Sequence, residues 1–242
     1  MQPYKILEWD SSFFGYGVAM LLQPSFNYNE LNSALQNLKK ENVKLAYWSP
    51  ENRINEKDKE QKIISLGGKL ADIKTVYQIN LEGKFSNEFL RDKRVKEYSE
   101  TFTHPDLISL AFESGVKSRY KVDERIGQQK FEELYKIWME HSVAKKIAKT
   151  ILVTVDGERL TGMITLGEKD GLGNIGLVAV DSFHRGKGLG YALFQEMFLW
   201  FIEHGYKKIS VVTQEANESA CKFYERAEFE KVSAQEFYHF WI

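Results

Sequence analysis

Residues 175–190 read Ile-Gly-Leu-Val-Ala-Val-Asp-Ser-Phe-His-Arg-Gly-Lys-Gly-Leu-Gly and hold the strongest structural signal in the sequence. The apolar run Ile175 to Val180 is too short for most helices and predicts a buried strand. From Leu189 onward, apolar residues recur at helical spacing and predict a long helix. A glycine-rich loop lies between them and ends at the helix N-terminus. Unpaired backbone N–H groups and the positive end of the helix dipole favour a bound phosphate at such a place.

Two common phosphate loops do not fit this stretch. The P-loop pattern Gly-x-x-x-x-Gly-Lys-Ser/Thr does not occur in the sequence. The dinucleotide fingerprint Gly-x-Gly-x-x-Gly needs a spacing that Gly186, Gly188 and Gly190 do not have. The pattern that fits is Arg-x-x-Gly-x-Gly, from Arg185 to Gly190, directly after a Val-x-Val strand. It resembles the coenzyme A loop of the GNAT N-acetyltransferase superfamily, and the alternative is a flexible surface turn before an ordinary helix.

Composition limits the classes of function that fit the chain. Its 242 residues suffice for one large domain or two small ones, and 43% hydrophobic with 28% charged residues is typical of soluble globular proteins. A net charge of −1 gives no electrostatic reason to expect nucleic acid or a membrane surface as partner. No apolar run reaches transmembrane length, and no signal-peptide pattern opens the chain.

Cysteine and histidine usage indicates the compartment of the protein and whether it binds a metal. A single cysteine, Cys221, excludes an intramolecular disulfide and favours a reducing compartment, so we expect a cytoplasmic protein. The five histidines and this cysteine show no metal-ligand spacing, and we expect no metal site.

The first half of the chain predicts a small sheet with two helices. Strands are predicted over residues 4–9, 16–22, 43–48 and 73–81, with a turn over 10–15. Helices are predicted over 29–41, with Asn29 as N-cap, and over 57–66, where Gly67-Gly68 is a stop signal. The charged segment 82–100 is low in large aliphatic residues and is interpreted as a linker.

The second half predicts helices, a hairpin, a strand, the glycine-loop helix, a strand, a helix and a final strand. The hairpin joins 150–155 to 161–166 through Asp156-Gly157, a preferred type I′ turn pair, and a second turn follows over 170–174. The remaining predicted elements are a loop over 114–120, helices over 128–141 and 218–226, and strands over 208–213 and 236–241.

This order of elements resembles the GNAT fold over residues 100–242. The resemblance implies an α/β (α+β) protein in which helices flank a mixed central sheet. Residues 1–85 repeat part of the order without a glycine loop. We therefore predict a truncated GNAT-like N-terminal domain, 1–85, beside a GNAT acetyl-CoA-binding catalytic domain, 100–242. Chance similarity between two strand-helix-strand runs is the alternative for the first domain.

Scattered motifs resemble one branch of this superfamily. The opening Leu7-Glu8-Trp9-Asp10-Ser11-Ser12-Phe13-Phe14-Gly15 is similar to that of the bacterial dTDP-fucosamine acetyltransferases, as are Ser118-Arg119-Tyr120 and the aromatic tail 238–241. The resemblance implies acetyl transfer from acetyl-CoA to the amino group of a nucleotide-linked (dTDP-type) amino-deoxy sugar, and a homodimer. The predicted acceptor residues are Ser118, Arg119, Tyr120 and Asp123. The alternatives are another small amine or protein amine as acceptor, or a non-catalytic CoA-binding module.

Amide formation needs a positioned thioester, a stabilised oxyanion and a proton for the departing thiolate. The resemblance implies that strand backbone pairs with the pantetheine arm and donates to the thioester oxygen; these residues are Leu177, Val178, Ala179 and Val180. The pyrophosphate would take the loop N–H groups of Arg185, Gly186, Lys187, Gly188, Leu189 and Gly190, with Arg185 or Lys187 adding positive charge.

Three side chains complete the predicted site. Tyr224 matches the family's tyrosine proton donor, with a core aromatic as the alternative. Asn217 would bond to the pantetheine arm or serve as a helix N-cap. Glu168 is a candidate base or amine contact, although a sugar amine can react with only water-mediated help. Glu228 stands where many family members carry glycine in a left-handed turn, which would cost on the order of 1 kcal/mol if the turn is kept.

Overall fold

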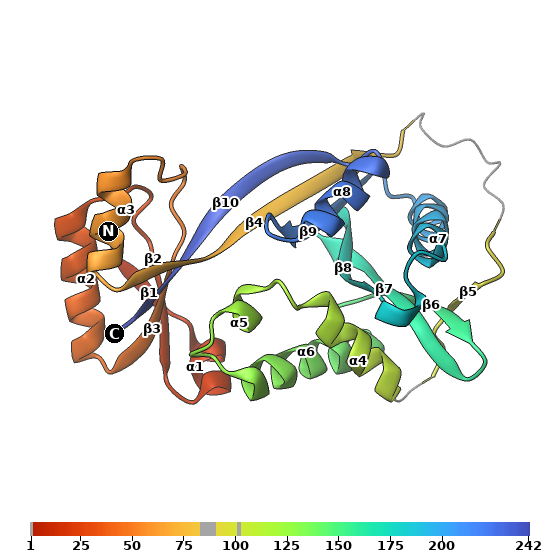
Figure 1. Ribbon diagram of the computed structural model, residues 1–242, viewed down its shortest axis with the longest axis horizontal. Coiled ribbons are helices and arrows are strands. Elements are labelled where there is room, and N and C mark those ends of the chain that lie inside the picture. The colour runs from red at the N-terminus through yellow and green to blue at the C-terminus, as the bar shows by residue number, and fades with distance from the viewer. Residues whose placement is uncertain (1, 83–90, 101–102) are drawn as a thin grey trace. The chain divides into compact units, whose positions relative to one another are not determined.

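The computed structural model describes residues 2–82, 91–100 and 103–242. The chain forms two compact units. Unit 1 comprises the residues up to Thr75 together with Gln214–Ala216 and Ser233–Ile242, and unit 2 comprises Val76–Thr213 and Asn217–Val232. Two long strands, β4 (Gly68–Asn80) and β10 (Glu230–Trp241), therefore contribute residues to both units (Figure 1).

Unit 1 is a small sheet covered by helices. Its strands are β1 (Tyr4–Ile6), β2 (Gly17–Leu21) and β3 (Val43–Trp48), followed in the sheet by the end of β10. β1 pairs antiparallel with β2, β2 parallel with β3, and β3 antiparallel with β10. The parallel connection runs through α2 (Tyr28–Lys40), and α3 (Lys57–Ser65) precedes β4. The apolar stripe of α2 is buried against the sheet and consists of Leu31, Ala34, Leu35 and Leu38.

The start of unit 1 differs from the prediction. Residues 8–14 form a helix, α1 (Glu8–Phe14), where a strand end and a turn were expected. Trp9 and Phe13 are four residues apart, and their rings stack at 5.3 Å and 3°, which favours the helical spacing. Gly15 ends the helix in the left-handed region, φ 76°, and its N–H bonds to the Ser11 carbonyl. The N-cap of α2 is also Asn27 and not Asn29.

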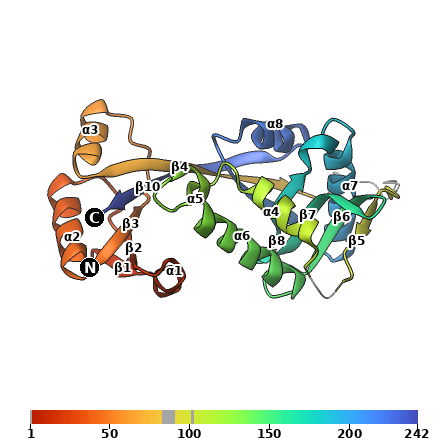
Figure 2. The ribbon, with the colours of Figure 1, turned by 60° about the horizontal axis from the view of Figure 1, so that its bottom comes forward.

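Unit 2 contains a mixed sheet in the order β4-β9-β8-β7-β6-β5. Its strands β5, β6, β7 and β8 lie side by side (Figure 2). The strands not yet given are β5 (Val95–Glu97), β6 (Thr150–Asp156), β7 (Arg159–Lys169), β8 (Leu172–Val180) and β9 (Lys208–Gln214). From β5 to β8 neighbouring strands are antiparallel, whereas β8 and β9 are parallel. The predicted mixed central sheet is therefore confirmed.

Helices cover both faces of this sheet. One face carries α4 (Pro105–Ser114), the short α5 (Arg119–Val122) and α6 (Gln128–Val143), and the other carries α7 (Leu189–Glu203) and α8 (Glu218–Arg226). The side chains of β6 show the alternation, since Leu152 packs in the cluster of α7 while Ile151 and Val153 pack in that of α4 and α6. No helix in the described part of the chain is long and apolar enough to cross a membrane.

Three local predictions in unit 2 need correction. Asp156 pairs with Arg159, so the hairpin loop is Gly157-Glu158 and not Asp156-Gly157. Of this pair only Gly157 has a positive φ, 59°, whereas the second turn has positive φ at both Asp170 and Gly171, the type I′ pattern. The predicted loop 114–120 is present but shorter, over 115–118, because α4 ends at Ser114 and α5 begins at Arg119. The predicted linker 82–100 contains β5, and its residues 83–90 lie outside the described part of the chain.

Candidate active site

The two parallel strands β8 and β9 separate part-way along their length. Their paired register covers Gly173 to Ile175 of β8 opposite Ile209 to Val211 of β9. β8 continues to Val180, but no further register joins it to β9 among the described residues. Gly176, in the middle of the strand, is consequently exposed to solvent. The separation leaves one edge of β8 available to a ligand.

A bulge in β8 begins where the strands separate. Leu166 of β7 faces Ile175 and Ile164 faces Val178, so Gly176 and Leu177 together oppose Thr165. The Leu177 N–H donates to the Thr165 Oγ1 at 2.8 Å. A Cβ at Gly176 would lie 2.5 Å from the same Oγ1, so a side chain at Gly176 would displace the threonine. The bulge therefore requires glycine here.

Beyond the bulge, the hydrogen bond of Asp181 fixes which peptide groups face the open edge. The Asp181 N–H donates to the Thr161 carbonyl of the neighbouring strand at 2.9 Å. Peptide groups alternate in direction along an antiparallel strand. Of the predicted strand residues, Leu177 and Ala179 therefore direct their peptide groups to β7, and Val178 and Val180 direct theirs to the open edge.

The loop after β8 has the geometry of an anion site. Gly186 and Gly188 both adopt φ 76°, a conformation that favours glycine. Gly188 is the N-cap of α7 and provides no side-chain cap, and the first helical bond runs from the Ala192 N–H to the Gly188 carbonyl at 3.0 Å. The N–H groups of residues 189–191 thus have no acceptor within the helix and point toward the loop, where they can bind phosphate.

Two ionic contacts hold this loop in place. Asp181 accepts from the Phe183 N–H at 3.1 Å and lies 2.6 Å from His184 Nδ1, and the His184 contact holds the pKa of the Asp181 carboxyl below its usual range. Arg185 donates from Nε to the Val180 carbonyl at 3.0 Å, and its Nη2 lies 2.6 Å from Glu113 of α4. The Arg185 side chain therefore braces the loop, and its charge is paired with Glu113.

Tyr224 lies in the apolar core on the α7 side of the sheet. Only 5% of its surface is exposed, and its ring lies 5.7 Å from that of Tyr77. Val178 and Val180 pack against the same apolar cluster. A Cβ at Gly190 would lie 3.5 Å from Phe223, the residue before Tyr224, so the loop and α8 are also close. Burial raises the pKa of the Tyr224 hydroxyl, which keeps it protonated and able to donate.

Asn217 serves as the N-cap of α8. Its Oδ1 accepts from the Ala220 N–H at 3.3 Å and from the Ser219 Oγ at 3.0 Å. Because the side-chain oxygen is used in this way, only the amide NH₂ group of Asn217 could donate to a pantetheine carbonyl.

Glu168 lies at the other end of β8 from the glycine loop. It faces Gly173, whereas Val180 at the loop end faces Gly162, which at strand spacing puts Glu168 about 20 Å away from that end. Its Oε2 accepts from Lys149 Nζ and from the Tyr206 hydroxyl, each at 2.7 Å, and the lysine contact lowers the pKa of Glu168. The structure places this carboxylate away from the glycine loop, and a lowered pKa makes it a weak base.

The predicted acceptor residues lie together at α5, where Ser118 is the N-cap and Asp123 the C-cap. Ser118 and Asp123 are 4% and 5% exposed, and within the described chain the Ser118 Oγ has no hydrogen-bond partner. The Arg119 guanidinium lies 4.4 Å from the ring centre of Tyr120. Tyr120 and Leu177 pack against one cluster, which lies on the face of the sheet opposite the cluster of Tyr224.

The sequence alone does not point to two residues of this site, Thr165 and Glu113. An isolated glycine inside a strand signals a bulge, so Gly176 could have indicated that some residue of β7 supports it. Glu113 comes from a helix far upstream of Arg185, and nothing local marks their pairing.

The match to known families covers this whole arrangement. The model of the acetyltransferase (GNAT) family matches residues 107–229, which include β8, the glycine loop and Tyr224. The chain belongs to the GNAT acetyltransferase family. GNAT proteins are in general acyl-CoA-dependent N-acetyltransferases that take acetyl-CoA and a small-molecule acceptor. No curated protein matches the chain.

Solved structures share the fold of this GNAT protein at low sequence identity. A functionally unknown conserved protein from Staphylococcus epidermidis ATCC 12228 has a TM-score of 0.66 and 12% identity over 92% of this chain and 83% of its own. A GCN5-related N-acetyltransferase from Sphaerobacter thermophilus has a TM-score of 0.57 and 17% identity over 98% of this chain and 75% of its own. A tandem GNAT protein from the clavulanic acid biosynthesis pathway has a TM-score of 0.52 and 13% identity over 92% of this chain and 74% of its own. At these identities the likeness shows the fold alone.

Proposed function

We propose that this GNAT protein transfers acetyl from acetyl-CoA to the amino group of a nucleotide-linked amino-deoxy sugar, by direct attack of the amine. The observation that carries acyl transfer is the meeting of two features at the loop end of β8, the open backbone edge at Val178 and Val180 and the uncapped loop at Gly188. The buried Tyr224 supports it, because it belongs to the apolar cluster against which both valines pack.

The coenzyme follows the open edge of β8. Its pyrophosphate takes the N–H groups of the loop from Arg185 to Gly190, and the pantetheine arm extends along β8 in place of the missing strand pairing. Val180 lies next to the loop, and Val178 lies farther along the arm, toward the thioester. The Val178 N–H then polarises the thioester carbonyl and stabilises the oxyanion that forms on it.

The reaction needs one proton donor on the sulfur side. The amine nitrogen attacks the thioester carbon, the C–N bond forms, and collapse of the tetrahedral intermediate breaks the C–S bond. Tyr224 donates its hydroxyl proton to the departing thiolate, and the proton lost by the amine passes to water. The raised pKa of Tyr224 supports this role, because the hydroxyl stays protonated at neutral pH.

The acceptor enters from the α5 face. Support comes from the buried Ser118 Oγ and Asp123 carboxylate and from Arg119 above the Tyr120 ring, which together offer a hydroxyl, negative charge for an amine, and positive charge for a diphosphate. The sugar itself rests on the resemblance of residues 7–15 and 118–120 to the dTDP-fucosamine acetyltransferases, which also implies a homodimer.

The first half of the chain is part of the same proposal. Residues 1–85 form a truncated GNAT-like domain, whose sheet is completed by the end of β10, and residues 100–242 form the catalytic domain. The parallel β2-α2-β3 connection of unit 1 supports this, because it has the layout of β8-α7-β9. A tandem GNAT protein among the similar structures is consistent with it.

A thiol-release assay with acetyl-CoA and a panel of dTDP- and UDP-linked amino sugars tests the function. We expect free CoA and a mass gain of one acetyl group on an amino sugar, and neither with the matched hydroxyl sugars. Turnover only with polyamines or peptide amino termini would contradict the acceptor. Acetyl-CoA binding without turnover of any amine would leave the non-catalytic CoA-binding module as the function.

A further inference from the structure

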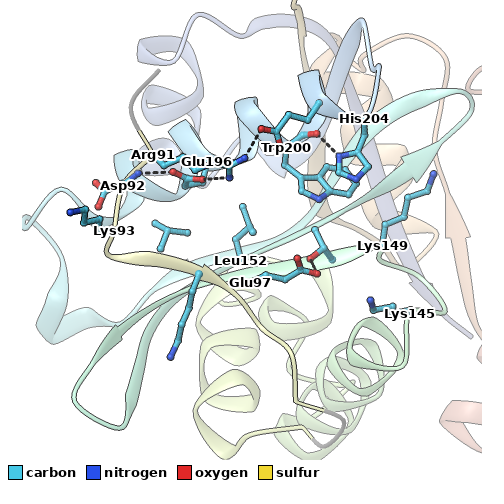
Figure 3. A pocket seen from close by; sticks show the side chains of 14 residues that line it. Arg91, Asp92, Lys93, Glu97, Lys145, Lys149, Leu152, Glu196, Trp200 and His204 are labelled. Carbon is cyan, nitrogen blue, oxygen red and sulfur yellow. Dashed lines mark hydrogen bonds and ion pairs between the residues drawn. The ribbon is translucent and has the colours of Figure 1, made fainter. Parts of the chain in front are cut away.

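Glu196, a carboxylate in the middle of the apolar helix α7, is buried with 7% of its surface exposed. Its Oε1 accepts from the Asp92 N–H at 2.6 Å and its Oε2 from Arg91 Nη1 at 3.3 Å. Figure 3 shows Arg91 and Asp92 converging on this carboxylate beside a cavity of about 810 Å³. A buried charge is tolerated only with such partners, so Glu196 fixes the segment before β5 onto α7.

The segment fixed by Glu196 is a turn that orients Arg94. The Val95 N–H donates to the Asp92 carbonyl at 2.9 Å, and the Arg94 N–H donates to the Asp92 Oδ1 at 3.0 Å. The Asp92 carboxylate also accepts from Arg94 Nε at 2.9 Å and from Nη2 at 2.6 Å. This two-point contact lowers the pKa of Asp92 and holds the guanidinium in one orientation.

The third nitrogen of Arg94 reaches the glycine loop. Nη1 donates to the Lys187 carbonyl at 3.2 Å, and a Cβ at Gly188 would lie 3.9 Å from the same nitrogen. The Lys187 carbonyl and the Gly188 N–H belong to one planar trans peptide and point in opposite directions. Arg94 therefore lies on the side of this peptide away from the Gly188 N–H.

The peptide next to Arg94 needs such a constraint. Gly186 and Gly188, both at φ 76°, flank Lys187, and glycine readily adopts either sign of φ. A flip of this peptide would aim its carbonyl, instead of its N–H, at an anion. A guanidinium bonded to the carbonyl disfavours the flip and polarises the N–H.

We propose that Arg94 is a positioning residue, which holds the Lys187–Gly188 peptide with its N–H toward the pyrophosphate of acetyl-CoA. Arg94 touches the loop and not the coenzyme. This role rests on the proposed binding of acetyl-CoA at the loop, and it extends the phosphate site to Asp92 and Glu196, which hold Arg94.

Calorimetric binding of acetyl-CoA to Arg94→Gln tests this role. We expect the Kd to rise about tenfold, the loss of one charge-assisted hydrogen bond, with kcat unchanged at saturating coenzyme. The Kd for 3′-dephospho-acetyl-CoA is expected to rise by the same factor, since Arg94 acts on the pyrophosphate through the loop. Arg94→Lys keeps a donor for the carbonyl and should recover part of the affinity.

Arg91→Gln is the matched control, because Arg91 shares the Glu196 anchor but makes no contact with the loop. Its Kd should stay within about twofold of the wild-type value. The proposal would be overturned if Arg94→Gln raised the Kd for acetyl-CoA but not the Kd for the 3′-dephospho coenzyme, since Arg94 would then bind the 3′-phosphate directly. Unchanged affinity in Arg94→Gln would overturn it too. After either of these results, binding of acetyl-CoA by the wild-type protein would still support the proposed function. A wild-type protein that bound no acetyl-CoA would contradict both the role of Arg94 and the proposed function.

Discussion

The strand-helix-strand units β2-α2-β3 and β8-α7-β9 share a layout and differ where the helix begins. In both, a helix joins two neighbouring parallel strands. α2 begins at Asn27, whose Oδ1 accepts from the Asn29 and Glu30 N–H groups at 3.1 and 3.3 Å. α7 begins at Gly188 without any side-chain cap. The Asn27 side chain thus accepts hydrogen bonds from N–H groups at the start of α2, whereas the N–H groups at the start of α7 stay available to a ligand.

The same two units differ in how far their strands pair. β2 pairs with β3 over its whole length, from Gly17 to Leu21, whereas β8 pairs with β9 only from Gly173 to Ile175. The helix cap and the complete strand pairing leave no backbone edge for a ligand in β2-α2-β3, which is therefore structural. In β8-α7-β9 the cap and part of the strand pairing are absent, and their absence creates the proposed coenzyme site. One supersecondary unit can therefore serve either purpose, depending on which backbone groups it leaves unpaired.

Gly188→Val should have the largest effect on this difference. A β-branched residue at φ 76° is strained, and relief of that strain would change the loop conformation that presents its N–H groups, so we expect acetyl-CoA affinity to fall about a hundredfold or more by calorimetry. Gly205→Val is the matched control, since Gly205 ends α7 at φ 77° with no atom near the added Cβ. Equal losses in both variants would assign the effect to strain in α7 and not to the loop.

Tyr224→Phe should separate catalysis from binding in the second unit. Loss of the proton donor is expected to lower kcat about a hundredfold, with acetyl-CoA affinity almost unchanged. Tyr77→Phe removes the neighbouring hydroxyl, which bonds to Glu225 at 2.9 Å, and should leave kcat near the wild-type value. Unchanged turnover in Tyr224→Phe would remove this residue from the mechanism.

The raised pKa of Tyr224 predicts the alkaline limb of the same reaction. A donor works only while protonated, and an ordinary tyrosine loses its proton near pH 10. Because burial raises the pKa of Tyr224, the loss of kcat from its ionisation should occur above that value. A kcat–pH profile of the folded enzyme that falls from a group with a pKa well below 10 would contradict Tyr224 as the donor.

Asn27→Ala should destabilise the first unit without touching the second. Loss of the α2 cap is expected to lower the free energy of unfolding by about 1 kcal/mol, measured by urea denaturation. Asn29→Ala is a control with little expected effect, because the Asn29 side chain does not cap the helix. Weaker acetyl-CoA binding in Asn27→Ala would show that the two units are not independent in this respect.

The smallest effect concerns the turn after the last helix of each unit. Gly67 follows α3 at φ 83°, but Glu228 follows α8 at φ 64°, which is strained for a glutamate. Glu228→Gly should raise the free energy of unfolding by at most about 1 kcal/mol. Glu228→Ala keeps the Cβ and should give no such gain; an equal gain would attribute the effect to the lost charge instead of the backbone.

Local patterns in the sequence predicted the parts of the site that depend on local structure. The apolar run of β8 and the spacing of Gly186, Gly188 and Gly190 indicate a strand, a loop and a helix start without knowledge of distant residues. Tyr224 was predicted only through resemblance, because a tyrosine beside Phe223 has the pattern of any core aromatic. The confirmed sheet class follows from the alternation of predicted strands and helices.

Long-range pairings could not be predicted in this way. The contacts of Arg185 with Glu113 and of Arg94 with Lys187 join residues far apart in the chain. The seven-residue α1 was missed because Leu7 and Trp9 alternate with polar residues as a strand does. Glu168 is different, because the predicted hairpin itself implies that the end of β7 lies next to the start of β8, away from the loop.

The last strand gives unit 1 an unusual order of assembly. Residues 233–242 belong to unit 1, and Tyr238 to Trp241 among them pair with the buried residues 45–48 of β3, yet they follow β3 by most of the chain. At the usual rates of translation, about 5–20 residues per second, roughly 8–30 s pass between Thr75 and Ser233. During that time β3 presents an unpaired apolar edge. The nascent N-terminal segment is therefore an expected client of ribosome-associated chaperones, even though it is synthesised first.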